Sequence, residues 1–150
     1  METMEARMVK LYARNNNHVA LHAIPGHFAT SHSHINFYID MTSLKTRANE
    51  AQEVAKSLAG DYVNSTVVDT IVCMDGTEVV GAYLAQEFEK RGFRNTNLHD
   101  TIYVVTPEYN ANNQLIFRDN TIPAIKGKNV ILLLATTTTG LTVWRSLECV

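Results

Sequence analysis

The clearest indication of the fold is the stretch Asn129-Val130-Ile131-Leu132-Leu133-Leu134-Ala135-Thr136-Thr137-Thr138-Thr139-Gly140-Leu141-Thr142. Its first half, from Asn129 to Leu134, is an apolar run typical of a parallel strand that is buried on both faces. Four threonines and Gly140 then predict a turn. Apolar residues at helical spacing follow this turn, namely Leu141, Val143, Trp144 and Leu147. A strand, a turn and a helix in this order form the building unit of parallel α/β sheets.

Two further buried strands are predicted upstream of this unit. Thr66 to Cys73 is a continuous apolar and β-branched run, and Thr101 to Val105 is a second one. Between them, Asp75-Gly76 predicts a turn into a helix that ends at Gly92. The apolar stripe of this helix consists of Val79, Val80, Tyr83, Leu84 and Phe88. Strands that alternate with helices predict one parallel α/β sheet, with ligands at the carboxyl ends of its strands.

The N-terminal part and one internal segment are less regular. Residues 3–14 carry Met4, Met8 and Leu11 at helical spacing, which predicts a short amphipathic helix. Residues 15–40 are rich in turns, with a strand predicted at 36–39, and a helix that Gly60 ends is predicted after Thr42. Residues 106–126 are long, polar and rich in Asn, which predicts a loop that acts as a lid or lacks order.

The composition excludes several classes of protein. The chain has 150 residues, 45% of them hydrophobic and 19% charged, which predicts a single globular domain and excludes a disordered chain. The net charge of −2 gives no basic excess, so neither nucleic acid nor a membrane is expected as a partner. Cys73 and Cys149 are predicted to be reduced core thiols, and no signal peptide or membrane span is evident. The protein is therefore expected to be cytoplasmic.

Two strand-to-helix turns are candidate anion sites. The threonine-rich turn at residues 136–142 and the turn at residues 75–77 each precede a helix, whose first N–H groups are free to bind an anion. Threonine also favours strands and caps helices, so a purely structural turn explains the first motif equally well on the residues alone.

Both turns have counterparts in a known family. The stretch from Val130 to Thr142 resembles the phosphoribosyl-pyrophosphate motif of type I phosphoribosyltransferases. Gly26 to Thr30, followed by Ser33 to Asp40, resembles the N-terminal hood of orotate phosphoribosyltransferases, and Val68 to Val72 resembles the strand before their pyrophosphate loop. The resemblance implies a single domain with a hood at roughly residues 15–40. It implies phosphate binding by Thr136, Thr137, Thr138, Thr139, Gly140, Leu141 and Thr142, and a pyrophosphate loop at Asp75, Gly76 and Thr77.

The chain departs from that family at two places that bear on activity. Leu134 and Ala135 stand where the family has two acidic residues, and alkyl groups accept no hydrogen bond from ribose. The segment at residues 106–126 lacks the family's basic cluster, because Arg118 is its one basic residue before Lys126. No catalytic residue is therefore assigned.

Three functions remain open at this point. The first is transfer of ribose 5-phosphate between phosphoribosyl pyrophosphate, with Mg²⁺, and a nitrogen base. The second is a catalytically weak or inactive regulatory module that binds a nucleotide or a phosphoribosyl group. The third is a flavodoxin-like domain in which the threonine turn only caps a helix.

Two expectations concern metals and assembly. Five of the six histidines fall between His18 and His34, yet Asp40 is the only carboxylate nearby, so no metal site is expected. The family continues for at least one strand beyond the motif helix, so the C-terminal strand of the sheet is expected to be missing. The helix after Gly140 is expected to rest on the sheet, and an uncovered sheet edge predicts a homodimer.

Overall fold

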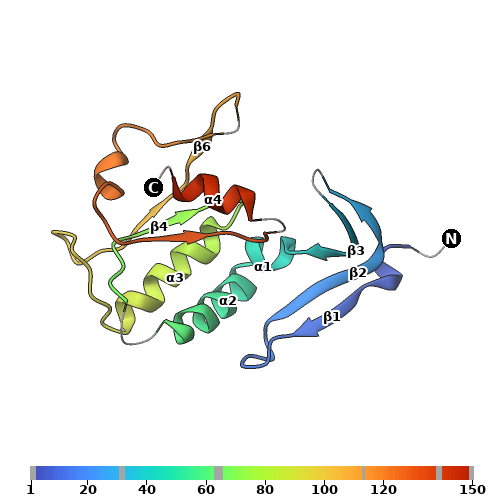
Figure 1. The fold of residues 1–150 in the computed structure, drawn as a ribbon. Coiled ribbons are helices and arrows are strands. Elements are labelled where there is room, and N and C mark those ends of the chain that lie inside the picture. Colours follow the sequence, from blue (N-terminus) through green and yellow to red (C-terminus); the bar gives the residue numbers. More distant parts are fainter. Residues whose placement is uncertain (1–2, 31–32, 63–65, 113, 138–139, 149–150) are drawn as a thin grey trace.

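The computed structural model describes residues 3–30, 33–62, 66–112, 114–137 and 140–148. The chain folds into an antiparallel sheet, formed by its N-terminal residues, and an α/β part formed by the remainder (Figure 1). The short helix α1, Thr42–Thr46, connects the two. Within the described ranges, no helix is long and apolar enough to cross a lipid bilayer.

The α/β part contains a parallel sheet with the strand order β5-β4-β8. The central strand β4, Thr70–Cys73, pairs with β5, Tyr103–Val105, on one side and with β8, Val130–Leu133, on the other. All four residues of β4 are buried, as expected for a central strand that is covered on both faces. The prediction of a parallel sheet combined with helices is therefore confirmed.

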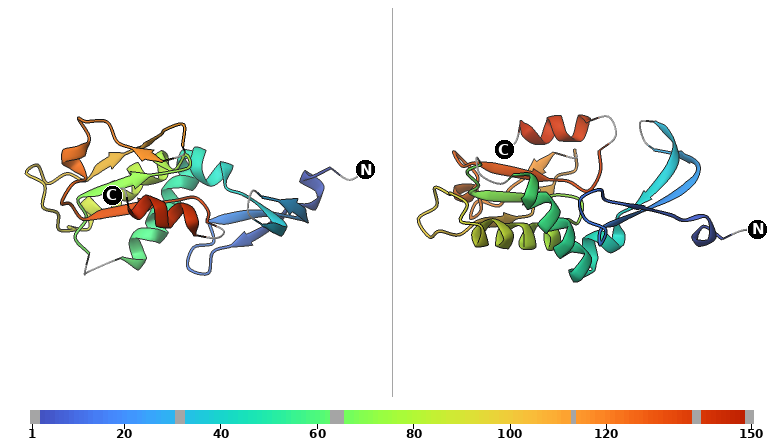
Figure 2. Two further views of the ribbon diagram at one scale, coloured as in Figure 1. Left: turned by 45° about the horizontal axis from the view of Figure 1, so that its top comes forward. Right: turned by 90° about the horizontal axis from the view of Figure 1, so that it is seen from below.

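Helices cover both sides of this sheet. α2, Ala48–Asp61, and α3, Glu78–Lys90, lie on one face, and α4, Leu141–Leu147, lies on the other (Figure 2). The main core forms between α2, α3 and the sheet. Its buried members are Ala51, Ala55, Ala59, Val68, Ile71, Cys73, Val80, Leu84, Ala85, Phe88, Ile102 and Leu133.

Two predicted elements differ from the observed ones in length. The helix predicted after Thr42 is broken at Arg47, whose extended backbone separates α1 from α2. β4 begins at Thr70 instead of Thr66, because upstream of Asp69 the backbone bonds to a different segment, with the Val68 N–H donating to the Arg94 carbonyl at 3.0 Å. Val67 forms only an isolated bridge with Arg94.

The prediction of a helix at residues 3–14 is wrong. Only the 3-10 turn η1, Glu5–Arg7, is helical there, and β1, Val9–Tyr12, follows it. β1 pairs with β2, Ala20–Ala29, which in turn pairs with β3, His34–Asp40. These three antiparallel strands are named the hood sheet. Pairing with β2 outweighs the weak helical pattern, so the hood sheet begins earlier in the chain than residue 15.

The segment at residues 106–126 contains regular structure. β6, Glu108–Tyr109, and β7, Leu115–Ile116, form a small hairpin, and η2, Ile122–Ala124, is a 3-10 turn. Asn110 stabilises the hairpin, because its side chain accepts hydrogen bonds from the backbone N–H groups of Asn112 and Gln114 at 2.9 Å each. The segment therefore contains regular secondary structure where its composition predicts a loop.

The expectation that α4 rests on the sheet through its apolar residues is wrong for two of them. The side chains of Trp144 and Leu147 are 66% and 60% exposed. Among the α4 side chains that the structure describes, Ser146 is the buried one. α4 therefore presents apolar surface to solvent.

Candidate functional site

The two candidate anion turns lie side by side at one edge of the parallel sheet. β4 and β8 run in the same direction in register, with Cys73 opposite Leu133, so the segments that follow them leave the sheet together. The Met74 N–H donates to the Leu133 carbonyl at 2.9 Å and extends this pairing by one residue. Both strands point toward α1 and the hood sheet (Figure 1).

The turn after β4 has an unusual backbone. Asp75 and Gly76 have φ values of 57° and 75°, in the left-handed region that disfavours most side chains, and both residues are exposed. Among the described residues, none accepts a hydrogen bond from the backbone N–H groups of Asp75 or Gly76. Asp75 therefore adopts a strained conformation at a solvent-facing turn that precedes the 13-residue helix α3.

Thr77 has a structural role in this turn. Its side chain is buried, and the hydroxyl lies 2.8 Å from the Met74 carbonyl and 3.2 Å from the Leu133 carbonyl. These contacts tie the turn to the end of β8. The Thr77 hydroxyl thus faces the protein, and of the predicted pyrophosphate loop the exposed part is Asp75 and Gly76.

A cation that sequence reasoning missed lies at the same turn. Lys45 comes from α1, and its Nζ donates to the Asp75 carbonyl at 2.7 Å. A Cβ built on Gly76 would lie 3.6 Å from the same Nζ. No local signal identifies this residue, because 30 positions separate Lys45 from Asp75.

The threonine-rich turn is described in part. Thr136 and Thr137 are exposed, and Gly140 adopts a left-handed φ of 77° immediately before α4. Thr138, Thr139 and the side chain of Thr142 lie outside the described residues.

The positions where the resembled family has acidic residues are apolar and half-buried here. Leu134 and Ala135 follow β8 directly and carry no oxygen ligand. Within the described ranges, no group of three or more His, Cys, Asp or Glu side chains is placed to hold a metal ion. The side chains at this edge therefore do not fit a protein-bound Mg²⁺ at the position of the acidic pair.

Tyr109, from β6, also lies near the turn after β4. Partial burial and the negative charge of Asp75 raise the pKa of the Tyr109 hydroxyl. The one basic residue of this segment before Lys126 is already paired, because Arg118 Nε donates to Glu108 Oε1 at 2.7 Å. The segment at residues 106–126 thus places the Tyr109 phenol near the turn after β4, and its Arg118 is not available to bind an anion there.

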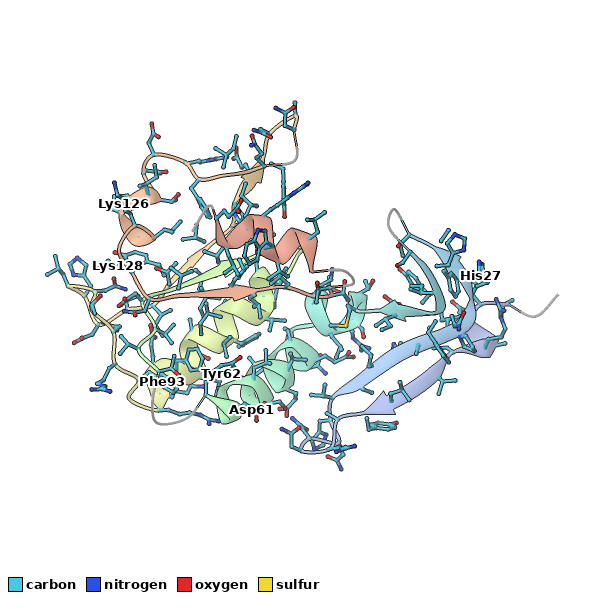
Figure 3. All side chains as sticks on the ribbon, viewed as in Figure 1. His27, Asp61, Tyr62, Phe93, Lys126 and Lys128 are labelled. Carbon is cyan, nitrogen blue, oxygen red and sulfur yellow. The ribbon has the colours of Figure 1, made fainter. Side chains whose placement is uncertain are left out.

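Two of the five clustered histidines, His27 and His34, form a side-chain pair. His27, which Figure 3 labels, and His34 lie in the hood sheet. His27 Nε2 lies 2.8 Å from His34 Nδ1. His32 lies outside the described residues. Asp40 interacts with Thr42 instead: hydrogen bonds from the Thr42 side chain and from its N–H, the latter at 2.9 Å, lower the pKa of Asp40.

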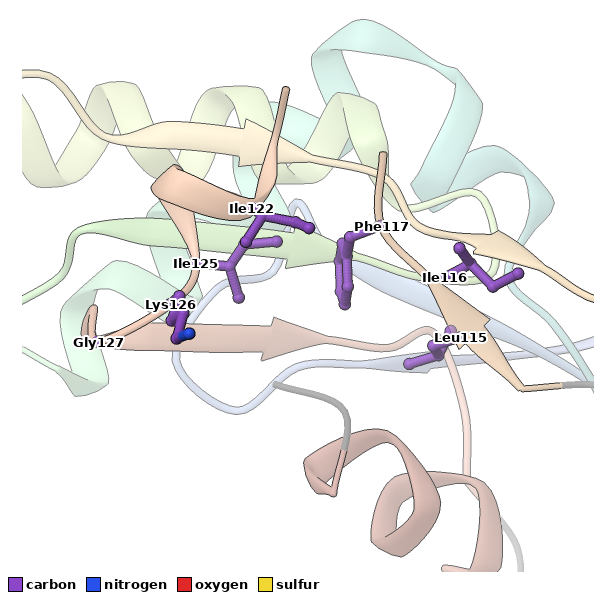
Figure 4. A pocket seen from close by; sticks show the side chains of 7 residues that line it. All are labelled: Leu115, Ile116, Phe117, Ile122, Ile125, Lys126 and Gly127. Carbon is purple, nitrogen blue, oxygen red and sulfur yellow. The ribbon is translucent and has the colours of Figure 1, made fainter. Parts of the chain in front are cut away.

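A separate apolar pocket of about 390 Å³ lies beside η2 (Figure 4). Its lining residues are Leu115, Ile116, Phe117, Ile122, Ile125, Lys126 and Gly127. None of the residues singled out in the sequence as anion-binding takes part in it. This pocket contains one charged group, the Lys126 ammonium.

Cys73 is unsuited to nucleophilic chemistry. The side chain is buried and free, and burial raises the pKa of its thiol to about 11. The nucleophilic thiolate is therefore scarce at neutral pH.

Comparisons with known proteins give no relative. No protein family, curated protein or solved structure matches the chain.

Proposed function

We propose that this protein is phosphoribosyltransferase-like, nearest to orotate phosphoribosyltransferases, and binds phosphoribosyl pyrophosphate or the 5′-phosphate of a nucleotide. One observation carries the proposal: the two glycine-containing turns follow neighbouring parallel strands and meet at one edge of the sheet. In open α/β sheets, ligands bind at the carboxyl ends of the strands, and helix N-termini there bind phosphate. The free, buried thiol of Cys73 fits a reducing compartment such as the cytoplasm.

The same edge favours binding over turnover. Leu134 and Ala135 supply no acceptor for ribose hydroxyls, and Arg118 is paired with Glu108. A leaving pyrophosphate needs positive charge where its negative charge develops, and loss of such a group typically costs about 10²–10³ in rate. The second candidate function, a catalytically weak or inactive module that binds a nucleotide or phosphoribosyl group, rests on these side chains.

Calorimetric titration tests the proposed function. Phosphoribosyl pyrophosphate, ribose 5-phosphate and mononucleotides are each expected to bind in a one-to-one complex, and an assay with orotate is expected to show turnover far below about 1 s⁻¹, the low end for ordinary enzymes. Failure of every one of these ligands to bind, with and without Mg²⁺, would contradict the proposal. Turnover in the ordinary enzyme range would contradict the preference for binding.

A double variant tests the interpretation of the two apolar positions. Any Mg²⁺ dependence of the natural chain comes from the pyrophosphate of the ligand, because Leu134 and Ala135 offer the ion no oxygen. Leu134→Asp with Ala135→Asp is expected to tighten binding of phosphoribosyl pyrophosphate in Mg²⁺ by about tenfold or more, since a charge-assisted hydrogen bond contributes roughly 1.5–3 kcal/mol. Leu134→Asn with Ala135→Asn is the matched neutral control. Equal affinity of all three proteins would refute the interpretation.

We also propose that the protein forms a homodimer through the hood sheet. One face of this sheet carries four exposed apolar side chains, Val9, Leu11, Phe37 and Ile39. Contiguous apolar surface of this kind commonly marks a protein–protein interface. Sedimentation at micromolar concentration is expected to give twice the chain mass of 16.8 kDa, and Leu11→Glu with Phe37→Glu is expected to give the monomer. A natural chain that sediments as a monomer would contradict this assembly.

A further inference from the structure

Lys45 joins the N-terminal part of the chain to the turn after β4. α1 begins two residues after the last residue of β3, Asp40, and Lys45 lies near its end. The Lys45 side chain is half-buried, and its Nζ lies 2.7 Å from the Asp75 carbonyl oxygen. A hydrogen bond of this length to a backbone atom holds the ammonium group at one place, at the carboxyl edge of the parallel sheet.

The Lys45 ammonium group forms no ion pair among the described residues, although its positive charge interacts with the Asp40 carboxylate. Within the described ranges, no carboxylate oxygen lies within 4 Å of Nζ, whereas the described ion pairs engage Arg47, Lys56, Lys90, Arg91 and Arg118. An ammonium group has three N–H donors, and the Asp75 carbonyl accepts one of them. Lys45 therefore combines a fixed position, a full charge and spare donors.

The turn beside Lys45 suits a close approach by an anion. Gly76 is exposed and has no side chain, and a Cβ there would lie 3.6 Å from Lys45 Nζ, so the space that a side chain would occupy adjoins the ammonium group. The Asp75 and Gly76 N–H groups have no acceptor among the described residues. The neighbouring Thr77 hydroxyl is already used inside the protein. Within the described ranges, Lys45 is therefore the cation placed to attract an anion to this turn, and its charge acts against that of the exposed Asp75 carboxylate.

We propose that Lys45 binds the pyrophosphate group of phosphoribosyl pyrophosphate, an inference that rests on the proposed function. The expected basic cluster is absent from residues 106–126, and α1 supplies a cation from a different part of the chain. Lys45 thereby determines specificity, because it distinguishes ligands that carry a diphosphate from those that carry a single 5′-phosphate. The residue also makes the pyrophosphate subsite depend on the position of the segment that follows the hood sheet.

Calorimetry on four proteins tests this assignment. The proteins are the natural chain, Lys45→Met, Lys45→Arg and the control Lys56→Met. The control removes the same type of side chain at a different place, where Lys56 pairs with Glu53 on α2. Inorganic pyrophosphate and phosphoribosyl pyrophosphate are expected to bind Lys45→Met about tenfold or more weakly, the typical effect of one charge-assisted hydrogen bond. Ribose 5-phosphate is expected to bind all four proteins within about threefold, and Lys45→Arg retains most of the pyrophosphate affinity.

The outcomes separate this inference from the proposed function. If ribose 5-phosphate binds the natural chain while Lys45→Met binds pyrophosphate as tightly as the natural chain does, Lys45 is not the binding residue and the proposed function stands. If the natural chain binds none of the three compounds, both proposals fail. Should Lys45→Met fail to fold by circular dichroism, a pyrophosphate titration of the natural chain followed by NMR decides: the Gly76 amide signal must shift, and an unmoved signal overturns the assignment.

Discussion

Asp69→Ala is expected to lower the free energy of unfolding by about 2–4 kcal/mol, the largest effect of any single substitution considered for this chain, because a hydrogen bond to a charged group contributes roughly 1.5–3 kcal/mol. The Asp69 side chain is fully buried just before β4. Its carboxylate accepts the backbone N–H and the side-chain amide of Asn129, each at 2.8 Å, and the backbone N–H of Thr96. Removing the acceptor deprives the Asn129 N–H, the Asn129 side-chain amide and the Thr96 N–H of their shared partner, and it separates the segments that lead into β4, β5 and β8.

The pH dependence of the free energy of unfolding gives a second test of the role of Asp69. Burial alone would raise the pKa of Asp69, but the hydrogen bonds from Asn129 and Thr96 outweigh burial and lower the pKa from 3.8 to about 2. The folded state thus favours the ionised form, and the resulting stability is present above the unfolded pKa and is lost as pH falls from about 4 to 2. The expected loss over this window is about 2 kcal/mol, since one pKa unit corresponds to about 1.4 kcal/mol.

Asp69→Asn is the control that isolates the charge. Asparagine keeps the shape and one oxygen acceptor, so this variant is expected to be less destabilised than Asp69→Ala at neutral pH. Urea unfolding at several pH values compares the variants with the natural chain. If Asp69→Asn loses the same stability as the natural chain between pH 4 and pH 2, the acid sensitivity belongs to another group.

Local sequence patterns predicted the α/β part well, and the reason is physical. β4 is fully buried and α3 buries one face, so their apolar content and period report their structure directly. β8 was predicted to be buried on both faces, but only Leu133 of its four residues is buried. β1 is four residues long with all four exposed, and no such pattern marks it as a strand. Its stability depends on pairing with β2, which local residue preferences do not reveal.

In the candidate site, too, the parts that are local in the sequence were predicted and the parts that depend on tertiary contacts were not. The turns after β4 and β8 were predicted because each joins a strand to a helix in one short stretch of sequence. Lys45 and Tyr109 reach the Asp75 turn from other elements, and only the folded chain brings them there. The structural role of Asp69 was not predicted for a related reason. A carboxylate inside an apolar run is taken as part of the strand, and its hydrogen-bond partners at Thr96 and Asn129 are known only from the folded chain.

Gly81 is another residue whose importance only the packing reveals. It lies within α3, where alanine is normally the more stable residue by about 1 kcal/mol. A Cβ on Gly81 would overlap the buried Sγ of Cys73 on β4, and it would lie 3.4 Å from Val104 Cγ1. The absence of a side chain at Gly81 therefore sets how closely α3 approaches β4.

Gly81→Ala is accordingly expected to destabilise the protein by about 1–3 kcal/mol, because the cost of overpacking exceeds the gain in helix preference. Gly60→Ala is the matched control within α2: a Cβ there meets no atom within 4 Å, so this variant is expected to be as stable as the natural chain or more stable. Adding Cys73→Ala to Gly81→Ala removes the overlapping sulfur and is expected to restore part of the loss, which a double-mutant cycle on unfolding free energies measures. A Gly81→Ala protein that gains stability as Gly60→Ala does would show that α3 and β4 are not in the close contact that determines this packing.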